Sequence, residues 1–179
     1  MVSFAPGVQP YNFTHMWSFE DLNYSGKGPK PQFCLEKNSV FGYIYNNRNF
    51  SRFRGIVEKA GLLAQLSELQ ADCTLFVPED RNLQGIPDKF FIDLDDGLAR
   101  QIVNASILNR RIGSELIKSS PCAYYYTRNP DMKMYVTNIG GKTTINEDLR
   151  ITEFDRCFSN GVIHIIDGLI IPNDRNFMN

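Results

Sequence analysis

The stretch Asn160-Gly-Val-Ile-His-Ile-Ile-Asp-Gly-Leu-Ile-Ile-Pro172 decides the fold of this chain. Its residues from Val162 to Ile171 are almost all apolar and many are β-branched, a composition that favours a strand. Strands that are apolar on both faces lie inside a sheet that is covered on both sides. We therefore predict that Val162–Ile171 forms a central, buried strand.

A second stretch, Thr74-Leu-Phe-Val-Pro-Glu-Asp80, has the same character. Its apolar run begins at Cys73 and is stopped by Pro78, which cannot continue a central strand. Together the two stretches predict the central strands of a wedge-shaped sheet covered by helices. Asp80 follows the strand, where an acidic residue caps a helix or forms a turn, and it is also a candidate interaction residue.

Helical patterns flank this second stretch. Phe53, Ile56 and Val57 have the spacing of one helical face. That helix is predicted to start near Ser51 and to end at Gly61, which suits a C-cap. Two further helices are predicted, one over Leu62–Leu69 and one that is capped by Asp95 or Asp96 and carries Leu98, Ile102 and Val103. The chain is therefore predicted to be α+β.

Beyond Tyr124 the pattern changes to strands. The predicted strands are Met132–Asn138, Lys142–Asn146 and Leu149–Phe158. They are separated by turn signals at Gly140-Gly141 and Asn160-Gly161. Both central residues of a type I′ turn need positive φ, which asparagine and glycine adopt more readily than other residues. Asn-Gly between apolar runs therefore indicates a hairpin.

These features in this order resemble the fasciclin domain. The resemblance rests on a helix that ends at Ala60-Gly-Leu62 and on the two apolar stretches that begin at Thr74 and Asn160. It implies a fasciclin-like wedge-shaped β-sandwich with short flanking helices over residues 48–173, followed by a C-terminal tail at 174–179. It also implies a non-enzymatic, adhesive role, with structural roles for His164 and Asp167.

One position departs from the family's pattern. Many fasciclin domains have a Tyr-His pair after the middle helix, whereas Ala105 and Ser106 stand there in this chain. The integrin recognition associated with that pair is therefore not expected.

Residues 1–47 are predicted to form an extended N-terminal arm. No sustained helical or alternating period runs through them, and they contain four prolines. The arm is also rich in aromatic residues, which solvated tails lack, so we expect it to bind a protein surface. Six of these residues are candidate interaction residues: Phe4, Tyr11, Phe13, Trp17, Phe19 and Tyr24. Tyr125, within Tyr124-Tyr-Tyr126, is another, although strand alternation allows one face of this run to be core.

Catalysis is not expected, and no catalytic, cofactor-binding or metal-binding residue is predicted. The chain has two histidines, His15 and His164, and no nucleophile or phosphate-binding motif. The run Asp93, Asp95 and Asp96 lacks the spacing of a calcium loop. Four widely separated cysteines are expected to be free thiols, and the four N-glycosylation sequons are expected to arise by chance.

A net charge of −1 gives no field that would attract nucleic acid. The sequence contains no run of about 20 apolar residues, so no membrane span is predicted. The N-terminus shows no secretory signal pattern. Fasciclin-like domains without such signals occur in large DNA viruses of the iridovirus kind. The resemblance thus implies a minor capsid protein in the virion, with other capsid proteins as partners and no small-molecule substrate. The alternative is a secreted or cell-surface adhesion module, and a small-molecule pocket stays open as a third possibility.

Overall fold

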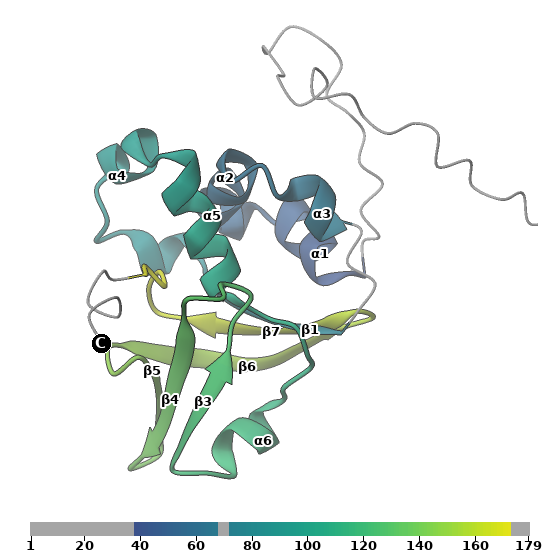
Figure 1. Cartoon of the computed structure of the whole chain (residues 1–179), viewed down its shortest axis with the longest axis vertical. Coiled ribbons are helices and arrows are strands. Elements are labelled where there is room, and N and C mark those ends of the chain that lie inside the picture. Colours follow the sequence, from purple (N-terminus) through teal and green to yellow (C-terminus); the bar gives the residue numbers. More distant parts are fainter. Residues whose placement is uncertain (1–37, 68–71, 173–179) are drawn as a thin grey trace, which may run out of the picture. The chain divides into compact units, whose positions relative to one another are not determined.

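A computed structural model describes residues 38–67 and 72–172 of the chain (Figure 1). The α-helices are α1 (Val40–Asn46), α2 (Ser51–Lys59), α3 (Leu63–Ser67), α4 (Asp88–Asp93), α5 (Asp96–Ala105) and α6 (Ser114–Lys118). Two 3-10 helices, η2 (Arg48–Phe50) and η3 (Asp80–Leu83), accompany them. The strands are β1 (Cys73–Pro78), β2 (Ile107–Leu108), β3 (Cys122–Tyr126), β4 (Lys133–Ile139), β5 (Lys142–Ile145), β6 (Leu149–Phe158) and β7 (Gly161–Ile166).

The two apolar stretches pair with each other at the centre of the sheet. Strands β1 and β7 run parallel, with Leu75 opposite Ile163 and Val77 opposite Ile165, and every residue of both strands is buried. This burial on both faces is what a parallel pair of apolar strands requires. The predicted buried central strands are confirmed, although β7 ends at Ile166, earlier than the predicted Ile171.

Alternation along these strands divides the interior into two cores. Leu75, Val77, Ile163 and Ile165 point toward a core shared with the helices. Their neighbours Phe76 and Ile166 point to the opposite side. That second core is completed by side chains from β3, β4, β5 and β6, namely Tyr125, Met134, Val136, Ile145 and Ile151.

The seven strands form one bent sheet, in the order β2-β1-β7-β6-β5-β4-β3. Helices α1 to α5 lie on one side of β1 and β7, whereas β3, β4 and β5 extend away on the other side (Figure 1). Strand β6 joins the halves, because its first residues pair with β5 and the rest pair with β7. The α+β architecture expected from the sequence is confirmed.

The predicted helix signals are also confirmed. Asp95 caps α5, because its Oδ1 accepts the backbone N–H of Leu98 at 2.9 Å. Gly61, with φ of 65°, takes up the left-handed conformation after α2. At the β4–β5 hairpin Gly140 and Gly141 both have positive φ, as a type I′ turn requires.

The second predicted hairpin turn is wrong in detail. The turn lies at Ser159 and Asn160, and Gly161 is the first residue of β7. Neither Asn160 nor Gly161 has positive φ. A glycine is needed at 161 for a different reason, because a Cβ there would lie 2.4 Å from the carbonyl oxygen of Cys73.

The expectation of an extended arm over residues 1–47 is wrong for its last part. Residues 1–37 lie outside the described residues, as does the tail at 174–179, but Val40–Asn46 is the helix α1. Ser39 caps this helix, and Val40, Phe41 and Ile44 are buried in the core that the helices share with the sheet. Helix α1 is therefore part of the folded domain, since tertiary packing favours a helix that its weak local signals do not predict.

Candidate functional site

The residues predicted to bind partners fall into two groups. Six of them lie outside the described residues: Phe4, Tyr11, Phe13, Trp17, Phe19 and Tyr24. The other two, Asp80 and Tyr125, are described, and both are held in place by contacts within the domain.

Asp80 caps helix α2 from a distance of 29 positions in the sequence. Its carboxylate accepts the Ser51 backbone N–H at 3.1 Å, the Ser51 hydroxyl at 2.5 Å and the Arg52 backbone N–H at 3.0 Å. These bonds satisfy donors at the start of the helix that have no partner within it. Asp80 thus fixes α2 to the end of β1, the role of a helix cap.

Tyr125 is buried, with 5% of its surface exposed, and belongs to the second core. Burial raises the pKa of its hydroxyl. Its neighbours Tyr124 and Tyr126 are 66% and 75% exposed. The choice of Tyr125 as a surface interaction residue is therefore wrong, and the exposed tyrosines are those on either side of it.

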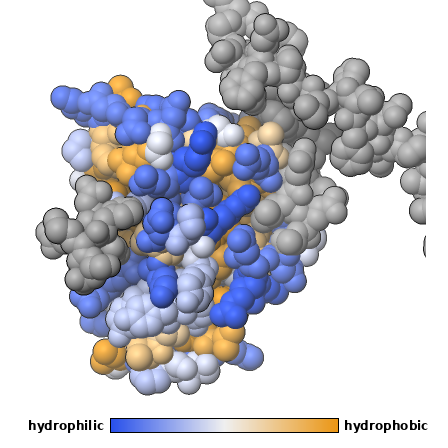
Figure 2. Space-filling view, in the orientation of Figure 1, coloured by the Kyte–Doolittle hydropathy of each residue, from blue (hydrophilic) through white to orange (hydrophobic). Residues whose placement is uncertain are grey.

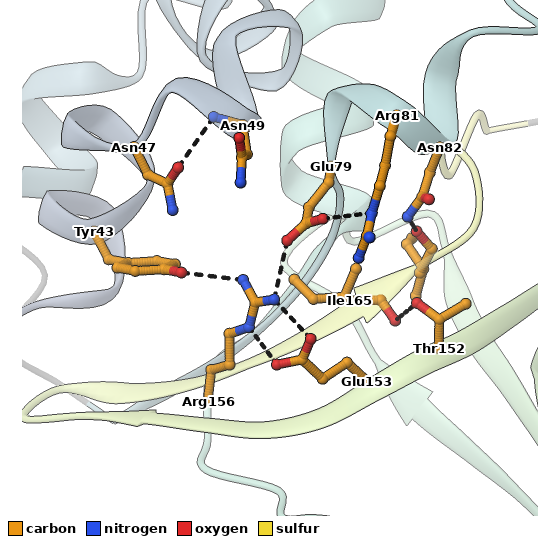
Figure 3. Close-up of polar contacts among 11 residues, drawn as sticks. Tyr43, Asn47, Asn49, Glu79, Arg81, Asn82, Thr152, Glu153, Arg156 and Ile165 are labelled. Carbon is orange, nitrogen blue, oxygen red and sulfur yellow. Dashed lines mark hydrogen bonds and ion pairs between the residues drawn. The ribbon is translucent and has the colours of Figure 1, made fainter.

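A charged cluster connects helix α1 to the sheet (Figure 3). The Arg156 guanidinium donates to Glu79 Oε1 at 2.9 Å and to both oxygens of Glu153, at 2.5 and 2.6 Å. It also donates to the hydroxyl of Tyr43 at 3.1 Å, and Arg81 forms an ion pair with Glu79 at 2.7 Å. Hydrogen bonds from Arg156 lower the pKa of Glu153.

This cluster depends on an irregularity in strand β6. The pairing of β6 with β7 shifts register between Ile151 and Glu153 and again between Glu153 and Arg156, and Asp155 has a φ of 61°. A bulge of this kind changes the direction of side chains along a strand. Here Glu153 and Arg156 come together beside Glu79, which is 5% exposed, so the cluster compensates a buried carboxylate.

Ser114, Asp155 and His164 lie close together but do not form a nucleophilic triad. The Ser114 hydroxyl donates to the Asp155 carboxylate, not to the imidazole. His164 is completely buried; its Nδ1 accepts the Asp155 backbone N–H at 3.1 Å, and its Nε2 lies 2.8 Å from the Ile112 carbonyl oxygen. Because both ring nitrogens are used by the backbone, His164 cannot take a proton from Ser114.

Other chemistry finds little support in the described residues. Within residues 38–67 and 72–172, no three His, Cys, Asp or Glu side chains gather closely enough to hold a metal ion. Cys73, Cys122 and Cys157 are free thiols. Cys73 is buried, and burial raises its pKa to about 11, so this thiol is not a ready nucleophile.

One of these exposed tyrosines, Tyr124, borders a groove of about 820 Å³. Tyr124 on β3 and Tyr135 on β4 are register partners, and their ring centroids lie 4.6 Å apart. We call this the tyrosine groove; its lining includes Tyr124, Asp131, Met132, Tyr135, Glu147 and Asp148. Figure 2 shows one face of the molecule, on which hydrophilic and hydrophobic residues are mixed. The tyrosine groove thus brings two aromatic rings and three carboxylates to one hollow of the described structure.

Comparison with known families agrees with the architecture. The model of the fasciclin domain matches residues 48–172, well over half of the chain. The chain belongs to the fasciclin family. Membership of the fasciclin family implies a non-enzymatic, adhesion-type role in protein–protein interaction.

A solved fasciclin structure shares the fold. It is a FAS1 domain pair from the insect cell adhesion molecule fasciclin I, with a TM-score of 0.65 and 17% sequence identity over 78% of this chain. This chain spans about half, 52%, of that domain pair. Among the described residues, no helix of this fasciclin-family chain is long and apolar enough to cross a membrane.

The altered Tyr-His position lies inside the fasciclin domain. Ala105 and Ser106 are 0% and 1% exposed, and the Ser106 hydroxyl donates to the Ile102 carbonyl oxygen at 2.9 Å. These two side chains offer no aromatic or imidazole group to a partner. Asp167, by contrast, has the expected structural role, since its carboxylate accepts the Arg150 backbone N–H at 2.7 Å.

Proposed function

We propose that this chain is a structural connector in a multi-protein particle, and specifically a minor capsid component of a virion assembled in the host cytoplasm. The fasciclin domain serves as a rigid block, and the segment before it binds neighbouring capsid proteins. The observation that carries the proposal is the position of the aromatic residues. Six large aromatic side chains lie between residues 4 and 24, outside the matched domain at 48–172.

Side chains of this kind are the usual anchors of protein interfaces. Tyrosine and tryptophan supply large contact areas at low entropic cost and are enriched among the residues that dominate binding energy. Many copies acting together would make modest single contacts sufficient. The net charge of −1 favours protein over nucleic acid as the partner.

The test compares the full chain with a chain that lacks residues 1–37, which keeps helix α1. Each is expressed with an affinity tag in cells that produce the particle, and assemblies are separated by density-gradient centrifugation. The full chain is expected in the particle fraction, and the shortened chain is expected to stay at the top of the gradient while still folded. Equal incorporation of both chains would contradict the connector role of the N-terminal segment.

A second candidate is an extracellular or cell-surface adhesion module. It is favoured by the likeness to a domain pair from an insect cell adhesion molecule. The sequon at Asn49 discriminates between the two, because this residue is exposed in η2 and would be open to glycosylation on a secretory route. Intact-mass analysis of the native chain should show no glycan if the particle proposal is right, and a glycan at Asn49 if the adhesion proposal is right.

A further inference from the structure

The tyrosine groove has the build of a peptide-binding surface. Met132, Leu169 and Ile170, each at most 7% exposed, supply apolar lining, and the Tyr124 and Tyr135 rings stand beside them. Strand β3, which carries Tyr124, is the last strand of the sheet. An aromatic-lined groove at a sheet edge suits an extended peptide better than a helix.

Three carboxylates add a negative charge to this groove. Asp131, Glu147 and Asp148 line it and are exposed, and within the described part of the chain none of them lies in an ion pair. The lysine of the lining, Lys133, has its ammonium 5.0 Å from the ring centroid of Tyr126. The three carboxylates outnumber this one ammonium, so the groove presents a net negative charge beside aromatic rings, a combination that attracts a cation.

The backbone holds these charges in place. Asn146 and Glu147 form the β5–β6 turn in left-handed conformations, with φ of 50° and 73°. The Asn146 side chain accepts the Tyr135 backbone N–H at 2.9 Å, and the Asn146 backbone N–H donates to the Tyr135 carbonyl oxygen at 2.7 Å. The acidic turn and the aromatic wall are thus joined directly, which lowers the entropic cost of binding a ligand between them.

The ligand that fits these features is an extended, basic segment that contains proline. Proline-rich segments bind aromatic-lined grooves because their polyproline II conformation is already formed. In that conformation residues three positions apart lie on the same side. Two cations at this spacing would face the three carboxylates while the prolines contact the rings.

The chain itself contains a basic sequence with two prolines, Lys27-Gly-Pro-Lys-Pro31. Its two lysines are three positions apart, its two prolines flank the second lysine, and it has no acidic residue. Lys30 precedes Asn38, where the described domain begins, by eight positions, an extended reach of up to about 28 Å.

We propose that the tyrosine groove binds the Lys27–Pro31 segment of a second copy of this chain. The assignment rests on the proposed connector function and names the surface on which part of the connector docks. A segment of one copy in the groove of the next is a head-to-tail contact, which builds rings or extended arrays.

A charge-swap experiment on the full chain tests this assignment. One variant carries Lys27→Glu and Lys30→Glu, and the other carries Glu147→Lys and Asp148→Lys. Self-association is measured by sedimentation equilibrium at low and physiological salt. We expect the unaltered chain to associate, each variant alone to associate at least tenfold more weakly, and the equimolar mixture to regain association in assemblies that contain both variants. Higher salt should weaken every one of these contacts.

A matched control carries Asp93→Lys and Glu115→Lys, which reverse two exposed carboxylates outside the groove lining. It should associate like the unaltered chain, and circular dichroism should show the same fold for all variants. The proposal is overturned if the control weakens association equally, if the mixture fails to regain it, or if the full chain stays monomeric with the segment bound in its own groove. Loss of particle incorporation on removal of residues 1–37, combined with a failed charge swap, would retain the connector function and reject the groove.

Discussion

The carboxylate of Asp80 holds the first residue of helix α2, Ser51, by two hydrogen bonds, one from its backbone N–H at 3.1 Å and one from its hydroxyl at 2.5 Å. The two residues are 29 positions apart, so the contact fastens the first α-helix of the matched family region to the end of a central strand. Asp80, which the sequence predicts as a contact for partners, therefore has a structural role as a helix cap.

Replacing Asp80 should therefore reduce stability. Asp80→Ala removes a charged N-cap and should lower the free energy of unfolding by about 1–2 kcal/mol. Asp80→Asn keeps a side-chain oxygen that can accept these hydrogen bonds, so it should lower the free energy of unfolding less. Urea unfolding followed by circular dichroism measures both. Asp93→Ala is the control, because Asp93 has a distant ion pair with Lys89 at 4.0 Å. An Asp80→Ala chain as stable as this control would refute the capping role.

Gly161 should not tolerate a side chain. A Cβ at this position would lie 2.4 Å from the Cys73 carbonyl oxygen and 2.9 Å from a methyl of Val40. Gly161→Ala should thus destabilise the domain by about 3 kcal/mol through overpacking. Gly55→Ala, in α2 with nothing within 4 Å of its Cβ, should instead stabilise it by about 0.5–1 kcal/mol. The midpoint temperatures of thermal unfolding of the two variants should shift in opposite directions. Shifts of the same sign would contradict the close approach of β7 to β1 at Gly161.

Stability should fall as pH drops below about 6.5, the ordinary pKa of histidine. Burial lowers the pKa of His164 in the folded chain, although the Ile112 carbonyl and the Asp155 carboxylate oppose this effect. A proton on Nδ1 would face the Asp155 N–H, so the unfolded state binds this proton more readily. The contribution of neutral His164 to the free energy of unfolding is fully present above pH 6.5. Below that pH it decreases by up to about 1.4 kcal/mol per pH unit.

Urea unfolding at pH 7.5, 6.0 and 5.0 measures this slope. The same slope should persist in a His15→Gln variant, in which His164 is the remaining histidine. If the slope disappears with His15, the assignment to His164 is wrong. The lowered pKa values of Glu153 and Asp155 add a further loss of stability only at more acidic pH, where carboxylates become protonated.

Two truncations should differ sharply because of helix α1. Removal of residues 1–37 should change the free energy of unfolding by less than about 1 kcal/mol. Removal of residues 1–47 also deletes the buried side chains of Val40, Phe41 and Ile44 and should cost at least about 4 kcal/mol or prevent folding. Limited proteolysis and urea unfolding of both chains provide the measurement, and equal stability would place the domain boundary after α1.

The sequence predicts the centre of this fold well because its signals there are local. The apolar runs that become β1 and β7 are buried on both faces, and Asp95 and Gly61 mark helix ends by their own backbone and side-chain chemistry. Helix α1 escapes prediction because its sequence, Val-Phe-Gly-Tyr-Ile-Tyr-Asn, has weak helix propensity and is stabilised by burial against the sheet.

The interaction residues were harder to predict, because their roles depend on distant parts of the chain. Strand alternation predicts that Tyr125 points to one face of the sheet and that Tyr124 and Tyr126 point to the other. Which of the two faces is buried depends on the bend of the sheet, which places Tyr125 in the core. The pairing of Tyr124 with Tyr135 depends on the register of β3 with β4. Asp80 likewise meets Ser51 only through the tertiary fold.

The stoichiometry of native assemblies tests the connector function most directly. Particles that contain this chain are purified by density gradient, and quantitative mass spectrometry compares its abundance with that of the other structural proteins. We predict a fixed ratio across independent preparations and across the whole particle peak. Recovery of the chain mainly as a free or cell-surface glycoprotein, with a variable trace in particles, would contradict the connector role and favour adhesion.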